Sequence, residues 1–496
     1  MTVSVAVPHH AGATTLLALP DPPVISHISD GHRLLRYVAK HHDALYDNAK
    51  FHRTAVTLPA GQVMRHLVPA LRAQISRHAA DRITAAVQRA HQHAALYGVK
   101  QAGVAECIAE ALCDPWSFRV HPEHLPRMQL RNRIATLMRS HRPIDLLLPV
   151  FSRKPLSPVK NHGPWPDLAE LASLAQLAGA AQVASALSPN GCRIVLLADG
   201  HKYRRACQTS AAQVDGYQQA LQFWISALGV QDQLVLQDYE AAVSEEVLGV
   251  PPGTREAAYR ARAAELAATY RHALNLDDLP GTLLRLAQGD AGATALGAAL
   301  GSLLTSVRYS ALAVQGDPVR RQNAYLHHLV HLHAPLDVAA ARWLGPEPAD
   351  EMQWLLESLR HEAWDAAIRY VAISSTDREL QVLRHHWPHA IKLTIHAKPG
   401  ELHCITTSRR NINMTAQHGC GGLLFGPGGA AIDIRYRIER EADAQVPVLI
   451  GVDAGQHETG PLAALHAATQ PFFYTNNPEA LHRDAWAEQL LLGDDA

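Results

Sequence analysis

The sequence predicts an α/β fold: a Rossmann-like, mostly parallel sheet flanked by helices, with an additional N-terminal helical region. Two observations carry this prediction. Between residues 144 and 240, continuous apolar runs, typical of strands buried on both faces, alternate with helical patterns. Before about residue 140, apolar residues instead recur three or four positions apart, which is the period of an α-helix.

Three apolar runs in the middle region have the length of strands and end at turn residues. They are DLLLPVF (145–151), CRIVLLADG (192–200) and DQLVLQDYE (232–240). The segments between them, 166–187 and 210–228, have helical patterns. Because a helix separates each pair of strands, we expect parallel neighbours with helices covering the sheet.

The last part of the chain has short strand-like segments with Gly and Pro turns between them. We expect these segments to pair in antiparallel fashion and either to extend the sheet or to form a second layer. They are RYVAISS (369–375), AIKLTIHAK (390–398), ELHCITTS (401–408), GGLLFGPGGAAIDIRYRIERE (421–441) and VPVLIGVD (446–453).

The length of 496 residues exceeds one ordinary hydrophobic core and predicts two or three parts. Residues 1–120 are predicted to form a helical N-terminal extension. Residues 121–445 are predicted to form the α/β catalytic domain, with an Ala- and Arg-rich helical insertion at about 252–360. Residues 446–496 are predicted to form a C-terminal segment packed on the core.

The overall charge excludes some partners. Lys and Arg together number 45 and Asp and Glu 46, so the formal net charge is -1. Nothing global attracts nucleic acid or an anionic membrane, and we expect neither as a partner. Any site for an anion must therefore be local.

Cysteine usage and the terminal sequence predict a cytoplasmic protein. The six cysteines form no CxxC pair and are mostly far apart, which is typical of reduced thiols. The N-terminus lacks the basic start and apolar core of a signal peptide. The longest uncharged apolar stretch, 291–307, is Ala- and Gly-rich and slightly short for a membrane span, so we expect a buried helix there.

A cationic loop follows the first predicted strand of the middle region. Arg153, Lys154 and Lys160 lie there among prolines that include Pro155 and Pro158. The prolines stiffen the loop, which reduces the entropy lost on binding. Arginine can bind phosphate or carboxylate with two hydrogen bonds, and lysine adds a point charge. The loop is a candidate site for an anion, and a solvated loop is the alternative.

Three carboxylates lie near predicted strand and helix ends. Asp167 and Glu170 have the spacing of a capping box, so a structural role stands beside an acid–base role. Asp199 is placed where the strand CRIVLLA would leave the sheet, and Gly200 follows it. A carboxylate there could act as a general base or hold a substrate amine or hydroxyl, although Asp-Gly is also an ordinary turn.

Histidines supply further candidates for proton transfer. His396 ends IKLTIH and His418 lies in TAQHGCGG, and either imidazole could carry protons or serve structure. The cluster LHHLVHLH at 326–333 places His327 and His331 four residues apart, as metal ligands on a helix would be. It lacks an HExxH glutamate and an obvious third ligand, so a metal-dependent enzyme remains an alternative.

Known nucleotide motifs are missing from the glycine-rich segment HGCGGLLFGPGG. Leu424 replaces the last glycine of a dinucleotide fingerprint, and no phosphate loop with GKS or GKT occurs. We interpret these glycines as hairpin turns and expect no NAD, ATP or other cofactor.

Four segments together resemble the pyoverdine/dityrosine biosynthesis family, whose bacterial members include isonitrile synthases. They are LPVFSRKPLSPVKNHGPWPDLAE (148–170), VLLADGHKY (195–203), IKLTIHAK (391–398) and MTAQHG (414–419). The first is the most specific, since its Lys, Gly, Pro-Asp and Glu positions match in type and spacing. The resemblance covers roughly residues 120 to 445.

Two positions depart from the family pattern. Lys392 stands where the family strand usually has arginine. Ala416 and Gln417 replace a Pro-Trp pair before His418. These changes concern the substrate pocket, and they leave the cationic character of the first segment intact.

The resemblance implies a reaction between an α-amino acid and a pentulose phosphate. In the isonitrile branch the amine condenses with the ketone of ribulose 5-phosphate, proton transfers rearrange the imine, phosphate leaves, and one carbon remains on nitrogen. The dityrosine branch is associated with an N-formyl amino acid. Neither branch requires a nucleotide or a metal.

This chemistry implies functions for the candidate residues. Arg153, Lys154 and Lys160 would bind the phosphate, and Lys392 or Arg153 would bind the amino-acid carboxylate. Asp199, His396 and His418 are the main acid–base candidates, with Asp167 and Glu170 behind them. We expect an amino acid and a sugar phosphate as substrates, and a tailoring oxygenase that acts on the product downstream. The sequence does not specify which amino acid reacts or the oligomeric state.

Overall fold

A computed structural model of the chain describes part of each region of the sequence. The described residues are 3–8, 14–19, 56–77, 79–114, 127–149, 166–204, 206, 211–275, 279–300, 349–394, 400–403, 420–427, 429–435, 448–453, 470–482 and 490–492. All structural statements below concern these residues.

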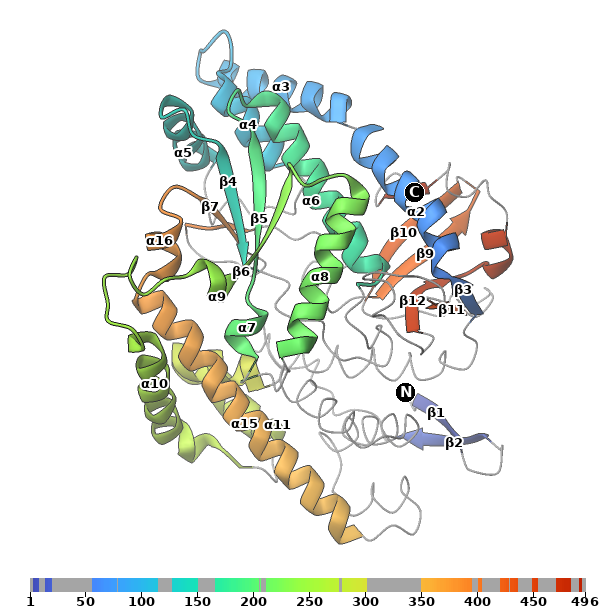
Figure 1. Ribbon diagram of the computed structural model, residues 1–496, viewed down its shortest axis with the longest axis vertical. Coiled ribbons are helices and arrows are strands. Elements are labelled where there is room, and N and C mark those ends of the chain that lie inside the picture. Colours follow the sequence, from blue (N-terminus) through green and yellow to red (C-terminus); the bar gives the residue numbers. More distant parts are fainter. Residues whose placement is uncertain are drawn as a thin grey trace.

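A five-stranded parallel sheet forms the centre of the molecule, in the order β6-β5-β4-β7-β8 (Figure 1). The predicted α/β fold with a parallel sheet is therefore confirmed. The strands are β4 (Ile144–Pro149), β5 (Cys192–Ala198), β6 (Leu234–Asp238), β7 (Ile391–Thr394) and β8 (Leu402–His403).

Both faces of this sheet are covered. Leu146 and Ile194 pack in the main core with α6 and α8, whereas Leu147 and Val195 point to the opposite face. There they pack against Tyr239 and other side chains of a smaller cluster. Burial on both faces explains why these strands are continuous apolar runs in the sequence.

Helix α6 (Leu168–Leu187) lies between several layers. It contacts β5, the N-terminal helices and strand β9 of a second sheet, and most of its residues are buried. A helix that is apolar on all sides requires such an environment. The helices that contact α6 are α2 (Ala60–Arg77), α3 (Ala79–Leu96), α4 (Val104–Leu112) and α8 (Ala211–Leu228). Helix α5 (Arg127–Arg139) packs against α4 and β4.

Helices α2 to α5 confirm the additional N-terminal helical region. Strands also occur in that region, which the sequence did not predict: β1 (Val3–Pro8) pairs with β2 (Thr14–Leu19), and β3 (Val56–Pro59) joins the second sheet. The division into parts at 120 and 445 remains a prediction.

Short helices follow two strands of the parallel sheet, and longer helices lie beyond them. Figure 1 shows β4 and β5 pointing toward α7, α9 and the helices α10 and α15. Their bounds are α7 (Gly200–Tyr203), α9 (Tyr239–Ala242), α10 (Thr254–Tyr270), η3 (Arg271–Ala273), α11 (Leu279–Ala287), α15 (Ala349–Glu379) and α16 (Val382–His386).

The segment RYVAISS (369–375), predicted as a strand, lies inside helix α15, so that prediction was wrong. Buried residues before it, such as Ala363 and Ala367, continue a helical period into the segment. Ser374 and Ser375 both donate their hydroxyls to the carbonyl of Val371, which satisfies them within the helix.

Six strands form the second sheet, in the order β13-β10-β9-β12-β11-β3. The pairs β9–β10 and β11–β12 are antiparallel, as expected for those segments, and the other pairs are parallel. The antiparallel pairing expected for 390–398 and 401–408 was wrong, because β7 and β8 join the central sheet as parallel strands. The strands not yet given are β9 (Cys420–Gly426), β10 (Gly429–Arg435), β11 (Val448–Asp453), β12 (Gln470–Thr475) and β13 (Leu490–Leu492), and η5 (Pro478–His482) follows β12.

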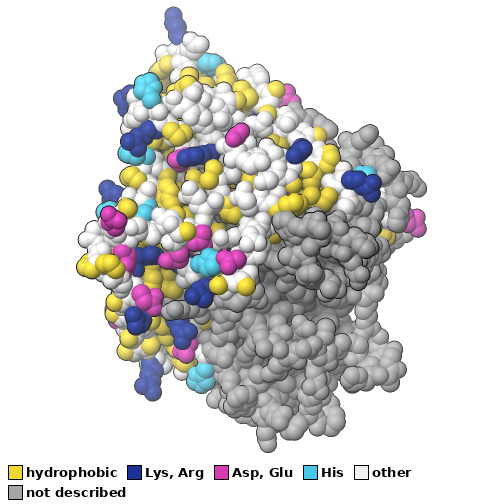
Figure 2. All heavy atoms as spheres, viewed as in Figure 1, with side chains coloured by type: hydrophobic (Ala, Val, Ile, Leu, Met, Phe, Trp, Pro, Cys, Tyr) yellow, Lys and Arg dark blue, Asp and Glu magenta, His cyan; other side chains and the backbone are white. Residues whose placement is uncertain are grey.

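The described surface carries both signs of charge. Figure 2 shows Lys and Arg interspersed with Asp and Glu on the visible face, in keeping with the formal net charge of -1. Residues 291–300, the described part of the apolar stretch, are helical, and Leu296 and Leu300 are buried. Among the described residues, no helix combines the length and the apolar character needed to cross a membrane.

Candidate active site

The carboxyl ends of four parallel strands lie at one edge of the central sheet. Pro149 of β4 is paired with Leu197 of β5, and Ala198 is paired with Asp238 at the end of β6. On the other side of β4, Leu147 is paired with Lys392 of β7. Ligands of open α/β sheets bind at such an edge, so this is where a site is expected.

Two of the predicted carboxylates, Asp167 and Glu170, are held in a complete capping box at the start of α6. Asp167 Oδ1 accepts hydrogen bonds from the backbone N–H of Ala169 at 3.1 Å and of Glu170 at 3.2 Å. Glu170 Oε2 accepts from the backbone N–H of Asp167 at 2.9 Å, and its Oε1 accepts from the Tyr217 hydroxyl at 2.5 Å.

The described contacts of Asp167 and Glu170 therefore show a structural role, the capping of α6. Burial, together with the nearby Glu170 carboxylate, raises the pKa of Tyr217, so the phenol stays a proton donor to Glu170. An acid–base function of Asp167 or Glu170 remains a prediction.

Asp199 lies where the sequence placed it, directly after β5 and before α7. The side chain is half-buried, and the backbone carbonyl accepts from the N–H of Tyr203 at 3.1 Å. The carboxylate therefore sits at the edge where the strand ends meet, on a backbone turn that a short helix holds. An acid–base function of Asp199 remains a prediction.

Lys392 lies within β7 and is ion-paired. Its Nζ is 2.6 Å from Glu401 Oε1, and Glu401 immediately precedes β8. The paired Leu147 and Lys392 point to the same face of the sheet. Any substrate carboxylate that bound Lys392 would compete with Glu401.

Several predicted residues fall outside the described part of the chain. These are Arg153, Lys154, Lys160, His396, His418 and the histidines of 327–333. Within the described residues, no three or more His, Cys, Asp or Glu side chains are grouped as metal ligands.

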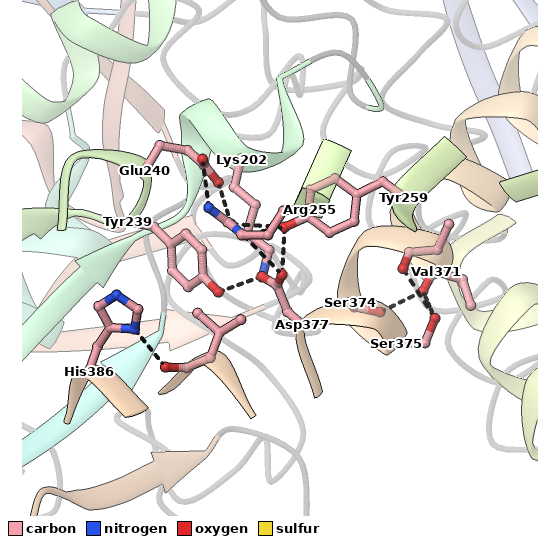
Figure 3. Close-up of polar contacts among 12 residues, drawn as sticks. Lys202, Tyr239, Glu240, Arg255, Tyr259, Val371, Ser374, Ser375, Asp377 and His386 are labelled. Carbon is pink, nitrogen blue, oxygen red and sulfur yellow. Dashed lines mark hydrogen bonds and ion pairs between the residues drawn. The ribbon is translucent and has the colours of Figure 1, made fainter. Parts of the chain in front are cut away.

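A buried polar cluster that the sequence did not predict lies beyond the ends of β5 and β6 (Figure 3). We call it the Asp377 network. Its members come from α7, α9, α10 and α15: Lys202, Tyr239, Glu240, Arg255, Tyr259 and Asp377.

Asp377 is the centre of this network. Lys202 Nζ lies 2.8 Å from its Oδ2, and the Tyr239 hydroxyl donates to the same oxygen. The Tyr259 hydroxyl donates to Oδ1 at 2.5 Å, and Arg255 Nε is 3.6 Å from that oxygen. The Lys202 and Asp377 side chains are only 8% and 6% exposed, so these contacts form largely away from water.

The outer part of the network balances its charge. Arg255 also pairs with Glu240 at 3.1 Å, and the Lys202 ammonium lies 4.2 Å from the centre of the Tyr239 ring. Two cations thus face two carboxylates. The arrangement holds α7 and α9, which follow strands β5 and β6, against α10 and α15.

The protonation states in the network follow from its contacts. Burial alone would raise the pKa of Asp377, but Lys202 and the two phenol hydrogen bonds hold that pKa below its ordinary value. Burial and the Asp377 charge raise the pKa of Tyr239 and of Tyr259. The carboxylate is ionised at neutral pH, and both phenols remain hydrogen-bond donors.

Sequence reasoning could have found only a fragment of this cluster. Arg255 and Tyr259 are four residues apart on one helix, which is a readable spacing, and Lys202 lies in the segment 195–203. Asp377 lies far along the chain in α15, two residues after the segment 369–375 that the sequence analysis predicted as a strand. No local signal connects it to Tyr239.

The parallel sheet with ionisable groups at its carboxyl edge defines an α/β protein of the kind that binds ligands at strand ends. Residues 134–277 match the family described as pyoverdine/dityrosine biosynthesis protein, so the resemblance is confirmed over that stretch. The solved structure of the PvcA protein from Pseudomonas aeruginosa is similar over 67% of this chain and 93% of its own, with 20% identity and a TM-score of 0.38. No curated protein matches this chain.

Proposed function

We propose that this protein is a biosynthetic enzyme similar to isonitrile synthases. It condenses the amine of an α-amino acid with ribulose 5-phosphate and leaves one carbon of the sugar on nitrogen. The proposal is supported by the family match over residues 134–277 and by the placement of the segments that resemble the family.

One observation carries the proposal: three of those segments leave neighbouring strands at the same edge of one sheet. The segment 148–170 begins at the end of β4, 195–203 runs from β5 into α7, and 391–398 begins in β7. Strands β5, β4 and β7 are consecutive and parallel. Groups far apart in the sequence therefore start from one small region of space.

The fourth segment, 414–419, immediately precedes β9 in the sequence. Strand β9 approaches the start of α6 so closely that a Cβ added at Gly421 would lie 2.6 Å from the backbone nitrogen of Ala169. Helix α6 begins at the end of the cationic segment 148–170. The described start of β9, which follows this segment in the sequence, therefore lies against the first turn of α6.

The chemistry at this edge suits the proposed substrates. A pentulose phosphate carries about two negative charges, and Arg153, Lys154 and Lys160 on the proline-rich segment supply cations for it. Asp199, directly after β5, is the main acid–base candidate among the described residues. His396 and His418 complete the set proposed for proton transfer.

The test is incubation of the protein with ribulose 5-phosphate and a panel of amino acids, followed by mass spectrometry and a phosphate assay. We expect a product in which the amine has gained one carbon and lost two hydrogens, with release of inorganic phosphate. A formamide would instead retain an added oxygen. A carbon-13 label at the ketone carbon should appear in the product, because that carbon bonds to nitrogen.

Ribose 5-phosphate is the matched control substrate, since it carries the same phosphate and lacks the ketone. We expect no product from it. If ribulose 5-phosphate stays unconsumed with every amino acid, the proposed function is refuted.

A further inference from the structure

His201 and Asp215 form a pair of side chains at the same edge of the sheet. His201 Nε2 lies 2.9 Å from Asp215 Oδ1, joining α7 to α8. His201 is two residues after Asp199, at the carboxyl end of β5. We propose that His201 is a catalytic proton carrier in this enzyme and that Asp215 positions its ring, an inference that rests on the proposed function.

The contact with Asp215 sets which nitrogen of the ring can accept a proton. A carboxylate only accepts hydrogen bonds, so Nε2 carries the hydrogen and Nδ1 keeps its lone pair. Within the described part of the chain, no residue forms a hydrogen bond with Nδ1 of His201. The His201 side chain is 24% exposed, so a bound substrate can reach it.

Helix α7 is fixed on the side away from Asp215. Lys202 is buried in the Asp377 network, and the Tyr203 ring stacks on Tyr370 of α15 with the ring centres 4.3 Å apart. With these two neighbours held by α15, His201 has little freedom to leave α8. Rigid support of this kind is what a positioned acid–base group requires.

Three ionisable groups on the helices packed against α7 are engaged elsewhere. Tyr239 and Glu240 of α9, together with Asp377 of α15, belong to the Asp377 network. Among the described residues, Asp215 is thus the one charged partner within hydrogen-bond distance of the His201 ring. The pair is distinct from the network and faces a different helix.

The proposed step is removal of a proton from the carbon next to the iminium that the amine and the ketose form. The C–H bond breaks, its electron pair forms a carbon–carbon double bond, and the iminium nitrogen takes back the pair of the C=N bond. The proton goes to Nδ1 of His201. A cationic iminium and a neutral imidazole thus become a neutral enamine and an imidazolium, and the imidazolium returns the proton to an oxygen in a later step.

The test compares the wild type with His201→Gln and Asp215→Asn in the ribulose 5-phosphate assay. We expect His201→Gln to lower kcat by about 10²- to 10⁴-fold, the usual contribution of a general base, with substrate affinities in calorimetry unchanged. It should also lose the acid limb of the pH–rate profile. Asp215→Asn should lower kcat on the order of tenfold, since a half-exposed carboxylate interacts modestly with its partner.

His272→Gln is the matched control, because His272 is an exposed histidine on η3. It should retain wild-type kcat and pH profile, and thermal melts should show all three variants folded. The inference is overturned, while the proposed function stands, if the wild type is active and the kcat of His201→Gln lies within about twofold of the wild-type kcat with an unchanged pH profile. If the wild type makes no product, both are overturned.

Discussion

Asp377 shows how much depends on one buried side chain. Removing charges from water costs several kcal/mol for each ion, and a buried pair recovers that cost only with good geometry and further hydrogen bonds. Asp377 has these, from Lys202, Tyr239 and Tyr259. The carboxylate therefore stabilises α7 and α9 at the edge of the sheet only while every partner remains.

The first prediction concerns the loss of that carboxylate. Asp377→Asn should lower the free energy of unfolding by about 3 to 5 kcal/mol, because Lys202 is left as a buried charge without a carboxylate. Urea denaturation measures the change. Glu379→Gln is the control: its pair with Arg262 is shorter, at 2.5 Å, but the two side chains are 60% and 29% exposed. It should cost less than about 1 kcal/mol.

If Asp377→Asn cost no more than Glu379→Gln, the burial argument for the network would be wrong. A double variant, Lys202→Met with Asp377→Asn, separates the causes. It should recover part of the loss, because it removes the uncompensated charge.

The second prediction follows from the lowered pKa of Asp377. A depressed carboxyl pKa adds stability that is fully present above the unfolded value, about 3.9 for aspartate, and is lost as the pH falls through the folded value. The stability difference between wild type and Asp377→Asn should thus be constant near neutral pH and shrink below about pH 4. Urea denaturation of both proteins across this range measures it, and a difference that did not shrink would contradict the assignment.

At the scale of whole elements, the sequence predicted what local pattern determines. The strands of the parallel sheet are apolar because both faces are covered. The capping box of α6 can be recognised from residues 167–170 of the sequence. Segment 369–375 was wrongly predicted as a strand because Val371 and Ile373 are apolar residues two positions apart, as in a strand. Their burial comes from a helical face that begins much earlier in α15.

The third prediction concerns the approach of β9 to α6. Gly421→Ala should lower the free energy of unfolding by about 1 to 3 kcal/mol, since the new Cβ collides with backbone atoms of the first turn of α6. Gly426→Ala in the same strand is the matched control, because nothing lies within 4 Å of its added Cβ. It should change stability by less than about 0.5 kcal/mol. Equal effects in thermal and urea denaturation would show that the close approach does not hold in solution.

At the scale of the whole molecule, long-range pairing decides what the sequence could not predict. Strand β3, with the letters Val56–Pro59, finds its partner in β11, almost at the other end of the chain. Asp377 likewise meets Tyr239 and Lys202 only because α15 packs beside α7 and α10. The candidate residues at strand ends could be predicted because the end of a strand is a local feature of the sequence. The Asp377 network could not, because it joins residues that are far apart in the sequence.

The last prediction uses the nearly neutral charge of the whole molecule. With a formal net charge of -1, the protein has no global field to attract a sugar phosphate, so the cations of 153–160 must act locally. Arg153→Gln combined with Lys160→Gln should raise the KM for ribulose 5-phosphate by about tenfold or more, as expected for lost charge-assisted hydrogen bonds. Lys100→Gln combined with Arg142→Gln changes the net charge equally at exposed positions, and Arg142 lies before the amino end of β4. That control should leave KM within about twofold, so equal effects of the two double variants would place the phosphate elsewhere.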